Sequence, residues 1–357
     1  ELDKYLVAMF EEKCSDLHLT SNNPPLYRLD GEIAHLRDMP VLQNDHVEAL
    51  IMPIMPQRNY EEFEETRDTD FAYSIEGIGR FRVNVFADRF GVGVVFRLIP
   101  SKILTAEDLN LPPKVLELCF LNKGLVVVTG PTGSGKSTTL AAMIDYINRN
   151  LSTHIITIED PIEFVHPTKR ALINQREIGV HTKGFKPALR AALREDPDIV
   201  LVGEMRDLET IEIAIETAET GHLVFGTLHT NTAPSTVDRI IDQFPSDRQA
   251  QVRTMLSESL RAVIAQTLCK KNGGGRIAAL EILMCTHAVS NLIREGKTFQ
   301  IPSIMSTAKR DGMVSLNDAL LDLVKSKQVE PKEAWLKAVD KGNMHNMLTR
   351  EGFHFEI

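Results

Sequence analysis

The chain has 357 residues, a formal net charge of -9 and a hydrophobic fraction of 43%. A chain of that length exceeds what one hydrophobic core usually fills, so we expect two domains and an ordinary globular protein. The acidic balance excludes a protein whose main task is to neutralise a nucleic-acid backbone, because that task needs a basic surface.

The first hundred residues predict a small α+β domain. The opening ELDKYLVAMFEEK has the apolar spacing of an amphipathic helix. Strand-like stretches follow, namely LHLT, LYRLDGEI with an Asp30-Gly31 turn signal, FAYSI, RFRVNVFAD and GVGVVFRLI. Phe81, Val83 and Val85 alternate with polar residues, which gives one buried and one solvated face. We therefore expect an antiparallel sheet in an N-terminal domain of residues 1–99.

The remaining sequence predicts a second domain built on a parallel sheet. Four apolar runs, LVVVTG, HIITIED, DIVLVGE and HLVFGTLH, are each followed by a turn and a helical stretch. Apolar runs without alternation suit strands covered on both faces, and intervening helices imply right-handed crossovers. We expect a RecA-like α/β domain over residues 114–357, after a proline-bracketed linker at residues 100–113. From about Glu258 helical spacing dominates, as in LRAVIAQTL and VSLNDALLDLVK, and predicts a helical C-terminal part.

A phosphate-binding loop, GPTGSGKS at residues 130–137, follows the first apolar run and precedes a helix-forming stretch. Glycines let successive backbone N–H groups turn inward around phosphate oxygens, and the helix N-terminus adds its positive dipole end. Lys136 should reach the β- and γ-phosphates of ATP, and Ser137 should offer its hydroxyl to Mg²⁺. The expected nucleotide-binding residues are Gly130, Thr132, Gly133, Ser134, Gly135, Lys136, Ser137, Thr138 and His222.

Acidic residues follow two other apolar runs. Glu204 ends DIVLVGE, and we assign it to water activation or, with Ser137, to the positioning of Mg²⁺. Glu163 follows HIITIED, after Pro161 ends regular pairing. The carboxyl ends of parallel strands meet at one edge of a sheet, so both carboxylates could flank the γ-phosphate. The alternative for each is a solvated acidic turn.

Two histidines border the fourth apolar run. A lone histidine in such a place is more often a core or turn residue than a catalytic one. His222 precedes the run, whereas His229 ends it at the edge where the nucleotide should lie. We therefore expect His229 to sense the γ-phosphate.

Arginines of the first domain are candidates for a catalytic cation. A multimeric ATPase needs such a cation, delivered across a subunit interface, to offset charge on the transferred phosphoryl group. The alternative is the solvated face of a sheet. The candidates on the strand ladder are Arg80, Arg82 and Arg97, and lower-ranked ones after the strands of the second domain are Arg206 and Arg239.

Four blocks occur in a fixed order: GPTGSGKS, TIEDPIEF, DPDIVLVGEMRD and TGHLVFGTLHT. They resemble the Walker A, Asp box, Walker B and His box of the secretion-type ATPases, which drive type II secretion, type IV pili and type IV secretion. CSDLHLT and LREDPDIVLVGEMRDLETIEIA are most similar to the pilus retraction ATPases, the PilT family. The retraction signature of that family, AIRNLIREGK, is matched by AVSNLIREGK at residues 288–297, with Val289 and Ser290 departing from it. Core packing on a helix would also explain Val289, Leu292 and Ile293.

The resemblance implies a homohexameric ring with a PAS-like N-terminal domain and a RecA-like motor, in which ATP and Mg²⁺ are held between subunits. It implies that Arg82 and Arg97 approach the nucleotide, and that ATP hydrolysis powers pilin removal and twitching motility. The implied partners are an inner-membrane pilus platform protein and a companion retraction ATPase. The implied location is the inner face of the cytoplasmic membrane.

Three alternatives remain open. An extension or secretion ATPase of the same superfamily would carry additional N-terminal domains and usually a four-cysteine metal insertion, and the sequence contains neither. A nucleic-acid translocase would need a basic aromatic groove, and no nucleic acid is expected as a partner. A non-hydrolysing accessory subunit is argued against by the intact Lys136 and Glu204.

Cysteine usage and hydropathy bear on the compartment. The four cysteines form no CxxC pair, which favours neither a zinc site nor a disulfide framework and suits a reducing cytoplasm. No apolar run approaches the roughly 20 residues of a spanning helix, so we expect no transmembrane segment and any membrane role to be peripheral.

Overall fold

The computed structural model describes residues 1–29, 32–35, 39–99 and 102–356. Contacts between Cα atoms divide the chain into two compact units, one of Glu1–Lys102 with Glu163–Val165 and one of Ile103–Ile162 with His166–Ile357. The division falls inside the segment expected to be the linker. The turn signal Asp30-Gly31 lies outside the described residues.

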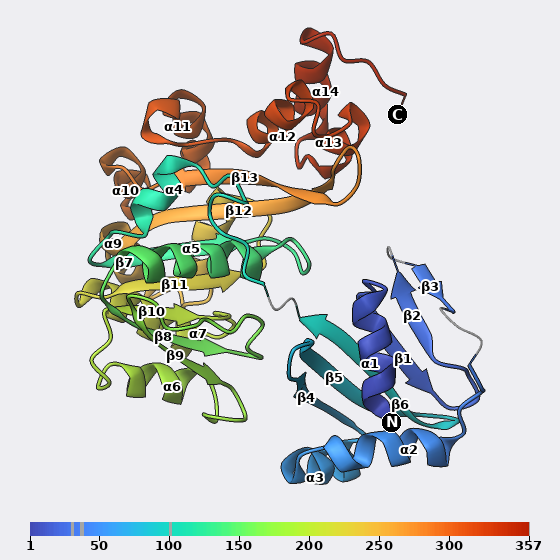
Figure 1. Ribbon diagram of the computed structural model, residues 1–357. Coiled ribbons are helices and arrows are strands. Elements are labelled where there is room, and N and C mark those ends of the chain that lie inside the picture. The colour runs from blue at the N-terminus through green and yellow to red at the C-terminus, as the bar shows by residue number, and fades with distance from the viewer. Residues whose placement is uncertain (30–31, 36–38, 100–101, 357) are drawn as a thin grey trace. The chain divides into compact units, whose positions relative to one another are not determined.

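The first unit is an antiparallel sheet with helices packed on it (Figure 1). The six strands have the order β3-β2-β1-β6-β5-β4, and each of their described pairings is antiparallel. The elements are α1 (Leu2–Glu11), β1 (Asp16–Thr20), β2 (Leu26–Leu29), β3 (Glu32–Ala34), α2 (Asn44–Ile51), α3 (Gln57–Thr66), β4 (Asp68–Ile75), β5 (Gly79–Asp88) and β6 (Gly91–Ile99). The predicted helix and antiparallel sheet of this region are therefore confirmed.

Alternation along β5 separates a buried face from a polar one. Phe81, Val83 and Val85 are fully buried, whereas Arg82 is exposed and Asn84 half-buried. The buried face packs against apolar side chains of α1, α2 and α3 in a single core. The period of two in the sequence had predicted this division.

The second unit is an α/β fold around a seven-stranded sheet of order β13-β12-β7-β11-β10-β8-β9. The described pairings are parallel except that of β13 with β12. The elements up to β13 are α4 (Pro113–Leu118), β7 (Gly124–Thr129), α5 (Lys136–Asn150), β8 (His154–Glu159), β9 (Leu172–Glu177), α6 (Phe185–Ala192), β10 (Ile199–Val202), α7 (Leu208–Glu219), β11 (Leu223–Leu228), α8 (Ala233–Asp242), α9 (Gln249–Ser259), β12 (Leu260–Lys270) and β13 (Arg276–Met284). The four apolar runs are β7, β8, β10 and β11, as predicted.

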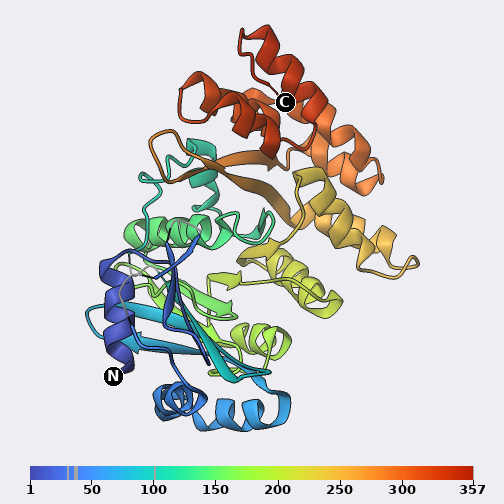
Figure 2. The same ribbon diagram turned by 90° about the vertical axis from the view of Figure 1, so that its right-hand side faces the viewer.

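Helices cover both faces of this sheet (Figure 1, Figure 2). One face packs against α4 and α5 in one hydrophobic core, and the other packs against α6 to α11 in a second core. Along β7, Val126 and Val128 enter the first core, whereas Leu125 and Val127 enter the second. Burial on both faces explains why the strand is a continuous apolar run.

The expectation of a helix over LRAVIAQTL is wrong, because these residues form β12. Most of the strand is buried, since β12 lies between β7 and β13 and is covered on both faces. A short apolar run bounded by polar residues fits a buried strand as well as a buried helix, so periodicity alone could not separate them. Strands β9 and β13 were also missed.

Helices return after β13, as expected for the C-terminal part. They are α10 (His287–Arg294), α11 (Ile301–Thr307), α12 (Leu316–Lys325), α13 (Pro331–Lys337) and α14 (Lys341–Arg350). The prediction of a helix in VSLNDALLDLVK is confirmed by α12. Helices α12 to α14 share a core with Cys269 of β12 and Ala279 of β13. Within the described residues, none of the helices combines the length and the apolar character that a membrane span requires.

Replacing Phe225 by Ala should destabilise the second unit strongly. Phe225 is a fully buried side chain at the middle of β11, and truncation of a core phenylalanine typically lowers the free energy of unfolding by about 3–5 kcal/mol. Thermal unfolding of purified protein measures the effect. Phe299→Ala is the matched control, because Phe299 is 76% exposed and its truncation should change stability by less than about 0.5 kcal/mol. Equal melting temperatures for the two variants would contradict the described core.

Candidate active site

The phosphate loop, residues 130–137, connects β7 to α5. Gly130, Gly133 and Gly135 all have positive φ angles, of 148°, 79° and 89°. A Cβ atom on Gly130 would lie 2.4 Å from the backbone oxygen of Gln266, so a side chain there would collide with β12. The absence of a side chain at Gly130 therefore allows the loop to pack closely against the neighbouring strand.

Lys136, His229 and Glu204 form one row of contacts at the carboxyl edge of the sheet. The Nζ atom of Lys136 lies 3.4 Å from Nδ1 of His229, and Nε2 of His229 lies 2.8 Å from Oε1 of Glu204. A neutral imidazole with its proton on Nε2 donates to the carboxylate and accepts from the ammonium, which fits both contacts. Lys136 begins α5, His229 follows β11 and Glu204 follows β10, and the structure brings the three residues together.

Glu204 is held in its charged form by its neighbours. Burial is the largest single influence and raises the pKa of this carboxyl, but the Arg206 guanidinium at 2.6 Å and the His229 contact together outweigh it, so that the pKa lies below the ordinary value. The Glu204 side chain is 20% exposed. A charged, half-buried carboxylate next to the phosphate loop suits a group that orients or deprotonates water. Arg206, which ranked low from sequence, is therefore part of the site.

Lys136 also contacts the backbone of its own loop. Its Nζ donates to the carbonyl oxygens of Gly130 at 2.7 Å and Pro131 at 3.1 Å. Neutral carbonyls are weaker partners for an ammonium than a phosphate is. A phosphate of a bound nucleotide would therefore compete with these carbonyls for the Lys136 ammonium.

A chain of hydroxyl groups joins the phosphate strand to the segment after His229. Thr129, at the end of β7, donates from Oγ1 to the Thr230 carbonyl at 2.8 Å, and the two threonine hydroxyls lie 2.7 Å apart. The Thr230 hydroxyl in turn lies 2.6 Å from that of Thr236 on α8. The contacts fix His229, the neighbour of Thr230, relative to the loop. The pattern of apolar runs in the sequence did not predict these hydroxyl contacts.

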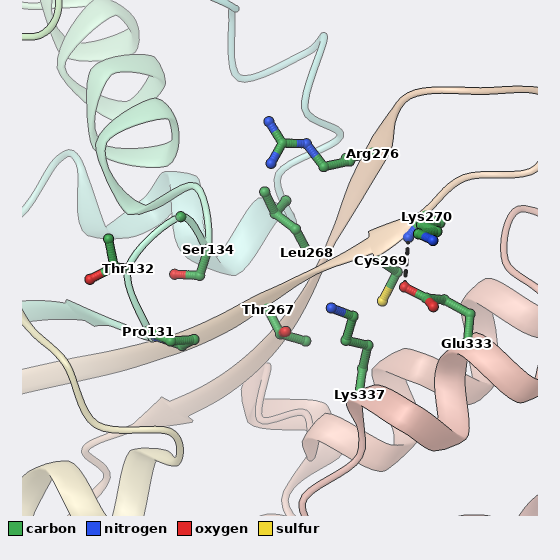
Figure 3. A pocket seen from close by; sticks show the side chains of 11 residues that line it. Pro131, Thr132, Ser134, Thr267, Leu268, Cys269, Lys270, Arg276, Glu333 and Lys337 are labelled. Atoms are coloured by element: carbon green, nitrogen blue, oxygen red, sulfur yellow. Dashed lines mark hydrogen bonds between the residues drawn. The ribbon is translucent and has the colours of Figure 1, made fainter. Parts of the chain in front are cut away.

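A pocket of about 280 Å³ adjoins the phosphate loop on its β12 side (Figure 3). One wall is made by residues 131–134 of the loop, and the other by β12, β13 and α13. Three cationic residues line it, Lys270, Arg276 and Lys337, together with Glu333, which accepts the Lys270 backbone N–H at 2.9 Å. The sequence did not predict this wall, because helical spacing had been expected over most of β12.

The expected magnesium ligands have suitable chemistry. Ser137 lies in the first turn of α5 and is exposed, so its hydroxyl is accessible. Among the described residues there is no group of three His, Cys, Asp or Glu side chains placed to hold a metal ion. Mg²⁺ is usually bound by one or two protein oxygens together with phosphates and water rather than by a full protein cage. A hydroxyl and the Glu204 carboxylate fit that mode.

His222, an expected nucleotide-binding residue, does not join the others. Its carbonyl accepts the N–H of Gly124 at 3.0 Å, at the start of β7, and its Nδ1 lies 3.3 Å from the carbonyl of Thr217. The phosphate loop begins at the other end of β7, a strand of six residues that spans about 20 Å. The structure thus separates His222 from the loop of its own subunit.

Three further predicted residues belong to the first unit. Arg82 and Arg97 face each other across β5 and β6. Arg97 pairs with the buried Asp16 at 2.8 Å and keeps 67% of its side chain exposed, and Arg82 lies 3.7 Å from Asp70. Glu163 lies in the segment 163–165, which packs with this unit. The part that these residues play at the phosphate loop stays a prediction.

The segment that matches the retraction signature lies mainly on α10. Val289 and Ile293 are fully buried in the core of the second unit, and Leu292 packs against that core. Core packing therefore accounts for these apolar positions. Ser290, where the signature has an arginine, is half-buried, and nothing in the structure explains that substitution.

Comparisons place these features among known proteins. A family model described as type II/IV secretion system protein matches residues 1–333. The type IV pilus retraction ATPase PilT of Pseudomonas aeruginosa is 52% identical over 338 residues, which cover 95% of this chain and 98% of that protein. A twitching motility protein of Neisseria gonorrhoeae is 48% identical, with 90% of this chain and 86% of that protein covered. A crystal structure of the pilus retraction motor PilT with bound ADP matches with a TM-score of 0.90 and 48% identity, covering 97% of this chain and 99% of that one.

Replacing Lys136 by Ala should weaken ATP binding by roughly 10- to 100-fold, because a hydrogen bond to a charged group contributes about 1.5–3 kcal/mol. Isothermal titration with ATP measures the dissociation constant. Lys123→Ala is the control, since Lys123 is exposed near the start of β7, at the end away from the loop. If Lys136→Ala binds ATP as tightly as the control does, the assignment of the loop is wrong.

Proposed function

The chain belongs to the type II/IV secretion system protein family, within its PilT group, and from that membership we propose that it is a hexameric motor whose ATP hydrolysis powers retraction of type IV pili. It is an ATPase that binds its nucleotide at the phosphate loop. The observation that carries the proposal is the row of Lys136, His229 and Glu204. A retraction ATPase needs a hydrolytic site, and this row supplies a cation, a linking imidazole and a charged carboxylate.

Hydrolysis needs a water molecule in line with the γ-phosphate and groups that stabilise the charge of the transition state. Glu204 is the group that accepts a hydrogen bond or proton from that water. His229 contacts the Glu204 carboxylate through Nε2 and Lys136 through Nδ1. Movement of Lys136 onto a phosphate would therefore change the position of the imidazole and, through it, that of Glu204. The imidazole thus makes the position of the carboxylate sensitive to whether the γ-phosphate is present.

Mg²⁺ would be held by Ser137 and, through water, by Glu204. The ion would neutralise charge on the β- and γ-phosphates when it is bound with ATP. Thr132, Gly133 and Thr138 would complete the cradle with their backbone N–H groups, whereas the Ser134 N–H donates to the Pro131 carbonyl at 3.1 Å.

Arg82 and Arg97 would complete the site from a second copy of the chain in the ring, and Glu163 would flank the γ-phosphate together with Glu204. Arg97 is oriented by Asp16 yet remains largely exposed, which suits a guanidinium that has to reach an outside phosphate. Each subunit would then supply a phosphate loop on one side and arginines on the other. Closing and reopening of such interfaces by rigid-body rotation would convert phosphate chemistry into movement.

The mechanical output requires partners at the membrane. We infer that the ring acts from the cytoplasm on an inner-membrane platform protein of the pilus, and that a companion retraction ATPase joins it. The acidic net charge of -9 argues against a nucleic-acid track for this motor.

Replacing Arg206 by Ala should move the acid limb of the pH–rate profile to higher pH. Arg206 lowers the pKa of Glu204, so its loss raises that pKa, and fewer carboxylates are charged at a given acidic pH. We expect the acid limb in the profile of kcat/KM for ATP to lie at higher pH than in the wild type. Arg194→Ala is the control, because Arg194 is exposed and lies just after the C-terminal end of α6. An unshifted acid limb would show that Glu204 does not govern the rate.

Replacing Glu204 by Gln should abolish most hydrolysis while ATP still binds. Loss of a general base or water-orienting group typically lowers kcat by about 10²- to 10⁴-fold. Steady-state phosphate release measures kcat, with Glu258→Gln, an exposed position on α9, as the control.

A deletion strain complemented with each variant tests the direction of the motor. Cells with the deletion, or with Glu204→Gln, should keep or gain pili and lose twitching, and the wild-type chain and Glu258→Gln should restore twitching. Bald cells would instead identify an extension motor and overturn the proposed retraction.

A further inference from the structure

The phosphate loop is attached to β12 by one buried side chain. Gln266 is 3% exposed, and its Nε2 donates to the Ser134 carbonyl at 2.6 Å, across 132 positions of the sequence. Ser134, the fifth residue of the loop, is also 3% exposed. The bond therefore joins the middle of the loop to a strand that belongs to a late part of the chain.

Both ends of the glycine pattern also pack on Gln266. A Cβ atom on Gly130 would lie 2.4 Å from the Gln266 backbone oxygen, and one on Gly135 would lie 3.0 Å from its Nε2. A larger residue at either position would push the loop away from β12. The loop therefore packs directly against Gln266 at both glycines.

The Gln266 amide is only half satisfied by its contacts. Its Oε1 is buried and has no hydrogen-bond partner among the residues that the structure describes. An apolar side chain of similar length would remove this unmatched acceptor, but it would leave the buried Ser134 carbonyl without its donor. What the amide offers, and an apolar side chain lacks, is the donor that engages Ser134.

That donor determines where the next N–H group points. In a trans peptide the C=O of Ser134 and the N–H of Gly135 point in opposite directions. Because the carbonyl is drawn toward Gln266 on β12, the Gly135 N–H is directed away from β12. A phosphate loop binds its ligand through backbone N–H groups that converge into the loop, so this orientation has to be held before the phosphate arrives.

We propose that Gln266 is a positioning residue for nucleotide binding, which orients the Ser134–Gly135 peptide so that its N–H points toward the phosphates. The proposal deepens the ATPase function proposed above and rests on it. Gln266 acts through the loop and does not itself touch the nucleotide. The orientation is needed equally in the ground state and the transition state, so its loss affects affinity more than turnover.

The test is the variant Gln266→Met, which keeps the length of the side chain and removes both the donor and the unmatched oxygen. The dissociation constants for ADP and for ATP with Mg²⁺ should rise by about 5- to 30-fold, as should KM, while kcat at saturation changes less than about threefold. The melting temperature of the nucleotide-free protein should fall by only a few degrees, because the Ser134 carbonyl loses its donor while the unmatched Oε1 is removed as well. A purely structural residue would instead lower the melting temperature and leave the nucleotide affinity of the folded protein unchanged.

Gln249→Met is the matched control. Gln249 donates from Nε2 to the Phe244 carbonyl at 3.0 Å on α9, which is the same kind of bond away from the loop. This variant should bind both nucleotides as the wild type does. Gln266→Glu provides a second test variant, because it keeps the shape but places an acceptor against the Ser134 carbonyl, and it should weaken binding at least as much as Gln266→Met.

The outcomes separate the two proposals. A wild-type chain that binds no ATP overturns the proposed function itself. A wild-type chain that binds ATP, with Gln266→Met and Gln266→Glu binding equally well, overturns the role of Gln266 alone. Weaker binding that is fully accounted for by the fraction of unfolded protein at the assay temperature also overturns it, because the loss then comes from general destabilisation of the fold.

Discussion

Convergence of backbone N–H groups on an anion is a demanding constraint on a polypeptide, because the same peptide planes must turn their carbonyls elsewhere. In this chain the carbonyls of Gly130 and Pro131 engage Lys136, and the carbonyl of Ser134 engages Gln266. The loop therefore depends on three elements: β7 precedes it, α5 follows it, and β12 packs against its side. The parallel sheet, with these elements adjacent, provides all three.

The same sheet explains why the chemistry gathers at one edge. Strands β7, β11 and β10 are neighbours and run parallel, so the residues that follow them emerge side by side. Lys136, His229 and Glu204 meet for that reason, and the threonine chain from Thr129 to Thr236 keeps the His229 segment close to the loop. His222 shows the converse, since it precedes its strand and lies at the other edge.

The sequence predicted what depends on local pattern and strand direction. Alternation predicted β5, continuous apolar runs predicted the four central strands, and glycine spacing predicted the phosphate loop. The strand β12 was missed because LRAVIAQTL, buried on both faces, has no period that separates strand from helix. Two features that depend on β12 were missed for the same reason: Gln266, a buried polar residue of that run, and the cationic wall of the pocket. Arg206 was a lower-ranked candidate in the sequence. Its ion pair with Glu204, two residues earlier, depends on how the turn after β10 folds, and residue spacing does not reveal that.

The position of β12 has a consequence for the newly made protein. Strand β7 is complete at residue 129, but one of its two partners in the sheet is β12, which ends at residue 270. Until that later segment leaves the ribosome, β7 lacks a neighbour along one edge and the loop lacks the side chain that orients it. At a synthesis rate of about 5–20 residues per second, the interval is on the order of ten seconds. A nascent motor therefore emerges with a phosphate loop that is not yet held in shape, and the loop gains its lateral support only when most of the chain has been translated.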